Sequence, residues 1–242
     1  MKKYGIIGYP LSHSFSQKYF TQKFTDEKIK DAVFEVYEMP DIKGVEPLLS
    51  DKELKGFCIT IPHKKNILPY LFERCGAVEE IGACNCVRIK NGKLFGYNTD
   101  VIGFEKSFVT HLQPHHKAAL VLGTGGAAAA VTYVLKKRGI AYHSVSTSNK
   151  PETLAYSELD KNILEAHSII INCTPLGTYP KTDQMPDIPY QFITSKHYLF
   201  DLVYNPLLTK FLALGKEKGA IIQNGYDMLI FQAEENWKIW NE

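Results

Sequence analysis

The chain has 242 residues, of which 45% are hydrophobic, and its 28 Lys and Arg against 26 Asp and Glu give a formal net charge of +2. A chain of this length can bury about 70–75% of its extended surface without disulfides or metals, and it suggests one or two domains. The near-neutral charge argues against nucleic acid as a main partner, because phosphate binding needs clustered Lys and Arg.

No run of about 18 apolar residues is present, so we expect no membrane-spanning segment. The first residues imitate a signal peptide, but Gly8, Pro10 and His13 interrupt the apolar stretch, which instead predicts a first strand. The five cysteines include no C-x-x-C pair, and only Cys84 and Cys86 are spaced to share one side of a strand. We therefore expect buried, reduced thiols in a cytoplasmic protein, and no metal site.

Short apolar runs alternate with helical patterns along the chain. Strands are predicted over residues 4–7, 33–37, 57–61, 118–122, 143–146, 168–172, 197–201 and 220–223, and helices over 17–24, 64–71, 127–138, 207–218 and 227–240. This alternation predicts an α/β fold with parallel sheets and helices on their faces. Residues 84–89 and 93–97 flank Asn91-Gly92, which predicts a hairpin with a type I′ turn.

A domain boundary is expected between residues 101 and 117, where a polar segment contains the helix-breaking Pro114. A strand, a glycine-rich turn and a helix follow, as at the start of a second α/β unit. The last helix carries Trp237 and Trp240, which are large apolar groups for a terminal helix. We expect it to dock back onto another part of the protein.

Residues 121–128 read VLGTGGAA, in which an apolar strand leads into a glycine-rich turn and an alanine-rich helix. Gly123, Gly125 and Ala128 occupy the small positions of G-x-G-x-x-A, where the first glycine permits a tight turn and the second lets backbone N–H groups approach a pyrophosphate. A glycine-rich turn without a ligand is the alternative. The strand–turn–helix context is the one that the motif requires, so we predict dinucleotide binding.

Two further segments place reactive side chains after predicted strands. Thr60 and Lys64 follow the strand at 57–61, and Thr99 and Asp100 follow the hairpin and open a helix. Taken singly, Lys64 is explained as a surface lysine, and Thr99 or Asp100 as a helix N-cap. Together, Lys64 and Asp100 around a substrate hydroxyl can move a proton while hydride leaves the carbon.

Ser14 and Ser16 stand two residues apart before a predicted helix. Ser14-x-x-Gln17 fits a capping box. A helix N-terminus with additional hydroxyls also binds a carboxylate, and the two interpretations are compatible.

Eight segments, taken in chain order, resemble the shikimate dehydrogenase family over nearly the whole chain. They are Ser14-x-Ser16, Thr60 with Lys64, Gly82-Ala83-Cys84-Asn85, Asn98-Thr99-Asp100, Gly123-Thr124-Gly125-Gly126, Thr174-Pro175-Leu176-Gly177, Asp201-Leu202-Val203-Tyr204-Asn205-Pro206, and Gly225-Tyr226-Asp227-Met228-Leu229 with Gln232. The family catalyses the reversible NADP-dependent reduction of 3-dehydroshikimate to shikimate, in chorismate and aromatic amino acid biosynthesis.

The resemblance implies a domain arrangement. An N-terminal α/β substrate domain would span 1–101, joined by a C-terminal helix at 226–242 that packs back on it. A Rossmann-like NADP domain would span 102–225. The substrate would lie in the cleft between the two domains.

The resemblance also implies residue roles. Lys64 and Asp100 would be the catalytic pair, with Lys64 as the proton acceptor. The substrate carboxylate would meet Ser14 and Ser16, and the ring hydroxyls would meet Thr60, Asn85 and Gln232, with Tyr204 nearby. The cofactor would contact Gly123, Thr124, Gly125, Gly126, Ala127, Ser146, Thr147, Lys150, Thr174, Leu202 and Gly225.

The chain departs from the family pattern at several positions. Cys58 and Cys86 stand where the family usually has Asn and Thr, and Gln17 stands where it has Pro. The Asn-Arg-Thr clamp for the cofactor phosphate appears as residues 146–148, Ser-Thr-Ser. No acid lies in 143–150 to repel a 2′-phosphate, and the hydroxyls with Lys150 can bind it. We predict NADP over NAD, by a smaller margin than with an arginine.

Two other functions stay open. One is a dehydrogenase that also takes quinate and uses NAD, and the other is a catalytically silent relative that binds a nucleotide or a shikimate-like ligand as a sensor. The presence of both Lys64 and Asp100 argues against the silent sensor. We expect a small-molecule substrate, no nucleic-acid or membrane partner, and a monomer or homodimer.

Overall fold

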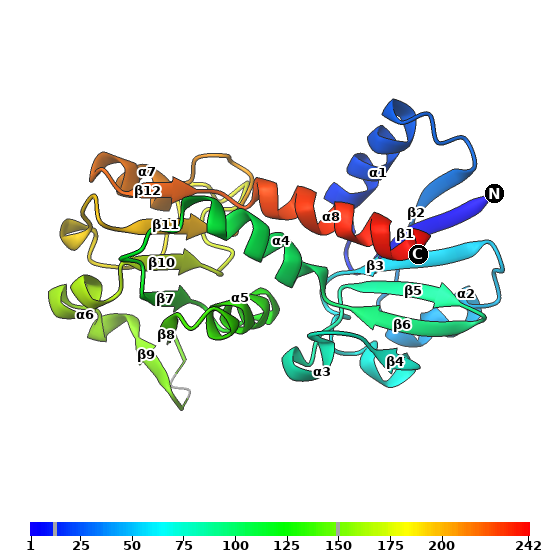
Figure 1. The fold of residues 1–242 in the computed structure, drawn as a ribbon, viewed down its shortest axis with the longest axis horizontal. Coiled ribbons are helices and arrows are strands. Elements are labelled where there is room, and N and C mark those ends of the chain that lie inside the picture. Colours follow the sequence, from blue (N-terminus) through cyan, green and yellow to red (C-terminus); the bar gives the residue numbers. More distant parts are fainter. Residues whose placement is uncertain (12–13, 149–150) are drawn as a thin grey trace. The chain divides into compact units, whose positions relative to one another are not determined.

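The computed structural model describes residues 1–11, 14–148 and 151–242, and the chain divides into two compact units. The first unit comprises Met1–Thr99 and Gln232–Glu242, and the second comprises Asp100–Phe231 (Figure 1). No helix within the described ranges has the length and apolar character needed to cross a membrane.

The first unit is built on a six-stranded sheet in the order β2-β1-β3-β5-β6-β4. β1 (Lys2–Gly8), β2 (Ala32–Glu38) and β3 (Leu54–Ile59) are parallel. β5 (Cys86–Lys90) runs antiparallel to both of its neighbours, β3 and β6 (Lys93–Tyr97). The short β4 (Glu73–Arg74) lies parallel to β6 at the edge. Asn91 and Gly92 both have positive φ, 53° and 71°, which confirms the type I′ turn.

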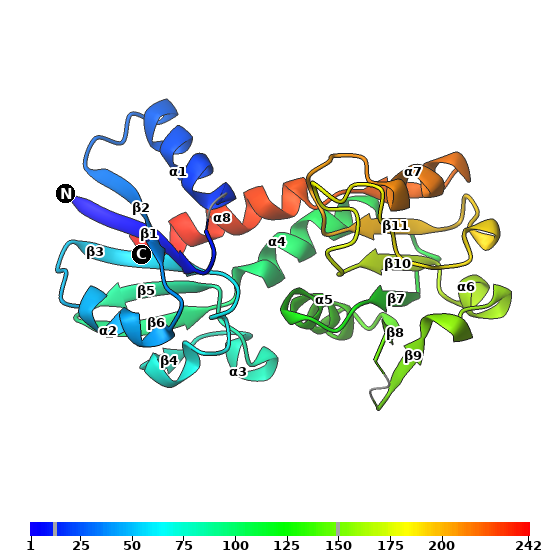
Figure 2. The same ribbon diagram turned by 180° about the vertical axis from the view of Figure 1, so that it is seen from behind.

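One face of this sheet is covered by α1 (Phe15–Asp26) and the C-terminal part of α8 (Tyr226–Asn241) (Figure 2). The Trp240 ring occupies the space over Gly56, where a Cβ would collide with it, and its Nε1 donates to the carbonyl of Val87 at 3.0 Å. Trp237 packs against Tyr4 at a ring-centroid distance of 5.1 Å. The expected docking of the C-terminal helix on the first domain is therefore confirmed.

The other face is covered by short pieces: η1 (Ile42–Gly44), α2 (Val45–Leu48), η2 (Leu68–Tyr70) and α3 (Val78–Ile81). The predicted helix at 64–71 is wrong, since these residues form turns and one 3₁₀ turn. Pro69 has no N–H and disfavours an α-helix that continues through Leu68, which begins a 3₁₀ turn instead. The carbonyl of Lys64 accepts instead from the N–H of Cys84 at 2.8 Å, so this segment is tied to a distant part of the chain.

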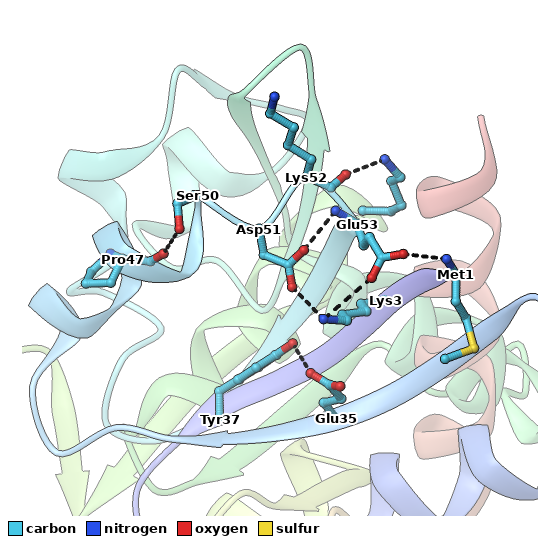
Figure 3. Close-up of polar contacts among 10 residues, drawn as sticks. Met1, Lys3, Glu35, Tyr37, Pro47, Ser50, Asp51, Lys52 and Glu53 are labelled. Atoms are coloured by element: carbon cyan, nitrogen blue, oxygen red, sulfur yellow. Dashed lines mark hydrogen bonds and ion pairs between the residues drawn. The ribbon is translucent and has the colours of Figure 1, made fainter.

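Ion pairs join the amino end of β1 to the residues before β3 (Figure 3). Lys3 Nζ lies 2.8 Å from Asp51 Oδ2 and 3.7 Å from Glu53 Oε2. The hydrogen bond from Lys3 lowers the pKa of the Asp51 carboxyl. These contacts lie at the amino edge of the parallel strands. Open α/β sheets bind their ligands at the opposite edge, where the strands have their carboxyl ends.

The second unit holds a fully parallel sheet in the order β12-β11-β10-β7-β8-β9. Its elements are α4 (Thr99–Phe108), η3 (Val109–His111), β7 (Ala118–Leu122), α5 (Gly126–Lys137), β8 (Ala141–Ser146), β9 (Thr153–Ala155), η4 (Tyr156–Glu158), α6 (Lys161–Ala166), β10 (Ile169–Asn172), η5 (Tyr190–Phe192), β11 (Tyr198–Asp201), α7 (Lys210–Glu217) and β12 (Ile221–Gln223). Counted along the chain this order is 3-2-1-4-5-6, the arrangement of a Rossmann fold.

Apolar residues fill both faces of the second sheet. Leu120, Leu122 and Leu199 share a buried cluster with Leu164 of α6 and Phe211 of α7. On the aromatic side, α4 stacks its Phe108 on Tyr198 of β11 at a centroid distance of 5.5 Å, and Phe104 meets Phe200 edge-on at 5.2 Å. Both faces are covered, as a parallel sheet requires.

Candidate active site

The carboxyl edge of the first sheet carries Thr60 and Lys64. Thr60 follows β3 directly, and its N–H donates to the carbonyl of Ile7 in β1 at 2.9 Å. The chain then turns, because the N–H of His63 donates back to the carbonyl of Thr60 at 2.9 Å. The bond from Cys84 to the carbonyl of Lys64 fixes this turn against the residue before Asn85.

Asn85 is 4% exposed and bridges two strands through its backbone. Its carbonyl accepts from Ile59 at 2.8 Å, and its N–H donates to Tyr97 at 3.0 Å. Its Oδ1 accepts the backbone N–H of Thr99 at 2.7 Å, and Thr99 immediately precedes Asp100. A series of bonds thus leads from the Lys64 backbone through residues 84–85 to the start of α4.

The N-cap expected at Thr99 or Asp100 is wrong, because α4 already begins at Thr99. Asp100 lies in the first turn of this helix. The side chain of Asn98, the residue before the helix, donates to the carbonyl of Ala83 at 2.9 Å.

Ser14 and Ser16 lie at the N-terminus of α1. Ser14 is the N-cap, and its Oγ accepts from the N–H of Gln17 at 3.3 Å. Ser16 is the second helical residue and is 8% exposed. The first turn of α1 contains no acidic residue, so the positive end of the helix dipole and two hydroxyls lie together there.

Gln232 lies on α8 and is 7% exposed. Its Oε1 accepts from Asn236 Nδ2 at 3.2 Å, and Asn236 is itself fully buried. Asn236 was not singled out from the sequence, although its spacing of four residues on a helix places it next to Gln232. Thr99 was singled out as a possible helix cap and as part of Asn98-Thr99-Asp100, but its bond to Asn236 was not expected.

The carboxyl edge of the second sheet carries the glycine turn. Gly123 follows β7 with φ +101°, a conformation that favours glycine, and a Cβ there would lie 3.1 Å from Thr174 Cγ2. Thr174 follows β10, so the two residues meet where the strand order reverses, which is the ligand-binding position of such sheets. Thr124, exposed, and Ala127, partly exposed, complete the turn into α5.

Gly125 and Gly126 leave open space at the start of α5. A Cβ at either glycine would meet no atom within 4 Å, so the backbone at the start of α5 is open. No side chain caps this helix at Gly125, which leaves its first N–H groups directed toward that space. An open helix N-terminus without side chains fits a pyrophosphate.

Asp201 and Asn172 end neighbouring strands and hold the adjacent loops. Asp201 is fully buried, and burial raises the pKa of its carboxyl from 3.8 to about 6. Its oxygens accept from Asn172 Nδ2 at 2.9 Å, from the N–H of Val203 at 3.0 Å and from Thr209 Oγ1 at 2.6 Å. Asn172 Oδ1 in turn accepts from the N–H and hydroxyl of Thr174, at 3.0 and 2.6 Å.

The other predicted residues of this unit lie on the same edge. A Cβ at Gly225 would collide with the carbonyl of Leu202, so the chain after β12 passes directly against the loop after β11. Tyr204 is half-buried, and burial raises the pKa of its phenol.

The expected phosphate-binding residues lie at the end of β8 and after it. Ser146 Oγ accepts from the N–H of Ser148 at 3.2 Å and lies 2.9 Å from its hydroxyl. Thr147 is exposed, and Lys150 lies outside the described residues.

All five cysteines are free thiols. Cys58, Cys84 and Cys86 are buried as expected, and burial raises the pKa of Cys84 to about 12. Cys75 and Cys173 are partly exposed, contrary to the expectation of burial for all five. Within the described residues, no group of three or more His, Cys, Asp or Glu is arranged to hold a metal ion.

Comparison with known proteins points to one family. Residues 6–87 match the family described as the shikimate dehydrogenase substrate binding domain. A shikimate dehydrogenase (NADP(+)) from Methanococcus maripaludis is 39% identical, with 99% of this chain and 91% of the relative covered. The crystal structure of shikimate dehydrogenase from Aquifex aeolicus has a TM-score of 0.88 at 32% identity, with 100% and 92% covered.

A second solved structure, from Thermus thermophilus, is a shikimate 5-dehydrogenase in complex with NADP(H) and shikimate. It superimposes with a TM-score of 0.87 at 26% identity, covering 99% of this chain and 93% of its own. The curated relatives share more than 30% identity with this chain over nearly the full length of both chains. The strand orders and the glycine turn agree with this similarity. The chain belongs to the shikimate dehydrogenase family.

Proposed function

We propose that this protein is an NADP-dependent shikimate dehydrogenase, which reduces 3-dehydroshikimate reversibly to shikimate. The observation that carries this proposal is the set of bonds from Lys64 through Cys84 and Asn85 to Thr99, the residue before Asp100. These bonds hold the backbones of the two acid–base segments to two adjacent residues, Lys64 to Cys84 and Thr99 to Asn85. The family membership supplies the substrate class.

The first unit would bind the substrate. This is the role expected for a domain over residues 1–101 together with the helix at 226–242. Ser14 and Ser16 would donate hydroxyl protons to the substrate carboxylate at the positive end of α1. Thr60, Asn85 and Gln232 would bind the ring oxygens, and Tyr204 is a further candidate for substrate binding. Buried amides at fixed positions suit a ring whose hydroxyl pattern must be distinguished from that of close analogues.

The second unit would bind NADP. This is the role expected for a domain over residues 102–225. The open backbone at Gly125 and Gly126 would take the pyrophosphate, with Gly123, Thr124 and Ala127 forming the turn. Thr174, Leu202 and Gly225 would lie along the nicotinamide half, and Ser146, Thr147 and Lys150 would take the 2′-phosphate. A bound nicotinamide would supply the acceptor or donor for the hydride exchanged with C3 of the substrate.

The protein's own part in the reaction is the transfer of the hydroxyl proton. As hydride leaves C3, the oxygen on C3 must lose its proton to become a carbonyl oxygen. Lys64 would take that proton, and Asp100 would orient the hydroxyl and the ammonium group that forms. In the reverse direction Lys64 would return the proton to the oxygen, so the same pair serves both directions.

The test is an assay of NADPH formation at 340 nm with the purified protein, shikimate and NADP⁺. We expect turnover with this pair, and slower turnover with NAD⁺. Comparable turnover of quinate with NAD⁺ would instead identify the broader dehydrogenase. Binding of shikimate or NADP⁺ by calorimetry without any turnover would identify a sensor. Either of these results would overturn the proposal.

A further inference from the structure

A fully buried amide with every polar atom engaged lies beneath the proposed substrate-binding face of the first unit. Asn236 is 0% exposed and follows Gln232 by one helical turn on α8. Its Oδ1 accepts from Thr99 Oγ1 at 2.6 Å. Its Nδ2 lies 3.2 Å from both Cys58 Sγ and Gln232 Oε1.

The single hydroxyl proton of Thr99 decides the orientation of this amide. Thr99 Oγ1 has two possible acceptors, Asn236 Oδ1 at 2.6 Å and Asn85 Oδ1 at 3.2 Å. Asn85 Oδ1 already accepts the backbone N–H of Thr99 at 2.7 Å, and the contact to Asn236 is the shorter one. The 2.6 Å contact to Asn236 has the length of an O–H···O bond and is shorter than an ordinary N–H···O bond, so Thr99 donates its proton there and the contacting atom of Asn236 is its oxygen.

The two protons of Asn236 Nδ2 are then directed at Cys58 and Gln232. A thiol sulfur and an amide oxygen both accept, so both N–H groups are used. Gln232 must consequently turn its Oε1 toward the interior. In the same way Asn85 turns its Oδ1 toward Thr99.

We propose that Asn236 is a positioning residue that sets the polarity of the substrate-binding amides, so that Gln232 presents its NH₂ group rather than its oxygen to the ligand. The inference rests on the proposed function, in which Gln232 meets the substrate ring. Asn85, with its oxygen held by Thr99, presents the same polarity. The site would then receive ring oxygens as hydrogen-bond acceptors, and each hydroxyl that accepts from an amide keeps its own proton to donate elsewhere.

This polarity defines the ligand class. A hydroxyl or carbonyl oxygen can accept from an amide N–H, whereas a protonated amine at the same ring position cannot, because it has donors only. An alternative in which Gln232 presented its oxygen would instead need a donor from the ligand and would not bind a carbonyl. An amide that presents its N–H groups can bind the oxygen of an alcohol and the oxygen of a ketone alike. A reversible dehydrogenase requires this for the oxygens around the substrate ring.

The test is the Asn236→Leu variant, which keeps the approximate shape and removes both orienting N–H groups. Thr99 can then donate to Asn85 instead, so the fold has a way to satisfy its hydroxyl. We expect KM for shikimate to rise about three- to tenfold, the effect of one neutral hydrogen bond, with KM for NADP⁺ and kcat within about twofold. Asn241→Ala, an exposed asparagine on the same helix, is the matched control and should leave all three constants unchanged.

A second arm separates positioning from a general structural effect. In a Gln232→Ala background, Asn236→Leu should raise KM by less than about twofold, because the residue through which it acts is gone. If Asn236→Leu does not fold, judged by circular dichroism, Thr99→Val removes the orienting donor instead and should give the same selective rise in KM.

The outcomes are distinct. If the wild type turns over shikimate but Asn236→Leu has an unchanged KM, or if its effect is fully additive with Gln232→Ala, the positioning role is wrong. If the wild type fails to turn over shikimate, the proposed function is wrong and the inference falls with it.

Discussion

Asp201 Oδ1 accepts a hydrogen bond from the side-chain amide of Asn172 at 2.9 Å, between residues that are directly paired at the ends of β10 and β11. This bond turns the oxygen of Asn172 toward Thr174, whose N–H and hydroxyl it accepts. One buried carboxylate thereby holds two loops at the proposed cofactor edge. Because it does so without solvent, its protonation state affects the stability of the unit.

The first prediction concerns the pH dependence of stability. The pKa of Asp201 rises from 3.8 to about 6 in the folded protein because burial outweighs its three donors. The folded state therefore holds this proton more tightly than the unfolded chain. The free energy of unfolding should fall as the pH rises from 4 to 6, by roughly 3 kcal/mol in all, and this loss persists above pH 6.

Urea unfolding of the wild type and Asp201→Asn at pH 4, 5 and 7 isolates this effect, because asparagine does not titrate. The wild type should lose stability relative to Asp201→Asn as the pH rises. Asp187→Asn, at an exposed position, should show no such trend. A difference that stays constant or grows with pH would contradict the assignment.

The second prediction concerns the proton acceptor. Lys64→Ala should lower kcat by roughly 10²–10⁴, the usual contribution of a general acid–base group, and change the affinity for shikimate far less. Lys65→Ala, at the exposed neighbouring position, is the control and should leave kcat near that of the wild type. Steady-state kinetics with the folded variants decides, and a near-normal kcat for Lys64→Ala would remove this residue from the mechanism.

The third prediction separates the two serines of α1. Ser16 caps nothing among the contacts described, so Ser16→Ala should raise KM for shikimate by an amount worth about 1–2 kcal/mol and leave Tm nearly unchanged. Ser14 is the N-cap, so Ser14→Ala should also lower the free energy of unfolding by about 0.5–2 kcal/mol. Measuring Tm and KM for both variants tests this division. A large loss of Tm with unchanged KM in Ser16→Ala would favour a purely structural role.

The fourth prediction tests the glycine turn. Gly125 has φ −79° and open space at its Cβ position, so Gly125→Ala should fold with an unchanged Tm. A methyl group there would occupy the space proposed for the pyrophosphate, and KM for NADP⁺ should rise by about tenfold or more, with KM for shikimate unaffected. Gly139→Ala is a useful contrast, since φ +67° should cost stability without touching the cofactor. Unchanged cofactor kinetics in Gly125→Ala would argue against a pyrophosphate at this turn.

The fifth prediction concerns cofactor choice. The wild type should prefer NADP to NAD in kcat/KM, because hydroxyls and a lysine rather than a carboxylate follow β8. Lys150→Ala should weaken NADP and leave NAD nearly untouched. Lys161→Ala, at an exposed position of the same unit, is the control for loss of one positive charge. A preference of the wild type for NAD would contradict this prediction.

Local patterns determined much of the fold. The alternation of short apolar runs with helical periods predicted both sheets, because each strand and helix is specified by its own hydrophobic period. Asn91-Gly92 predicted its turn because both positions need positive φ, and VLGTGGAA predicted the strand–turn–helix because only small residues permit it. The resemblance carried by eight short segments identified the family and named the candidate residues.

Long-range contacts decided the rest. Residues 64–71 have a helical pattern, yet Pro69 and the bond between Lys64 and Cys84 hold them in turns, and β4 and β9 are too short to show a period. The pairing of Thr99 with Asn236 joins residues 137 positions apart, and that of Asn172 with Asp201 joins residues 29 apart. A hydrogen bond between buried side chains depends on which elements pack together. The sequence therefore indicated which residues would react, and only the tertiary structure decided how their amides and carboxylates are oriented.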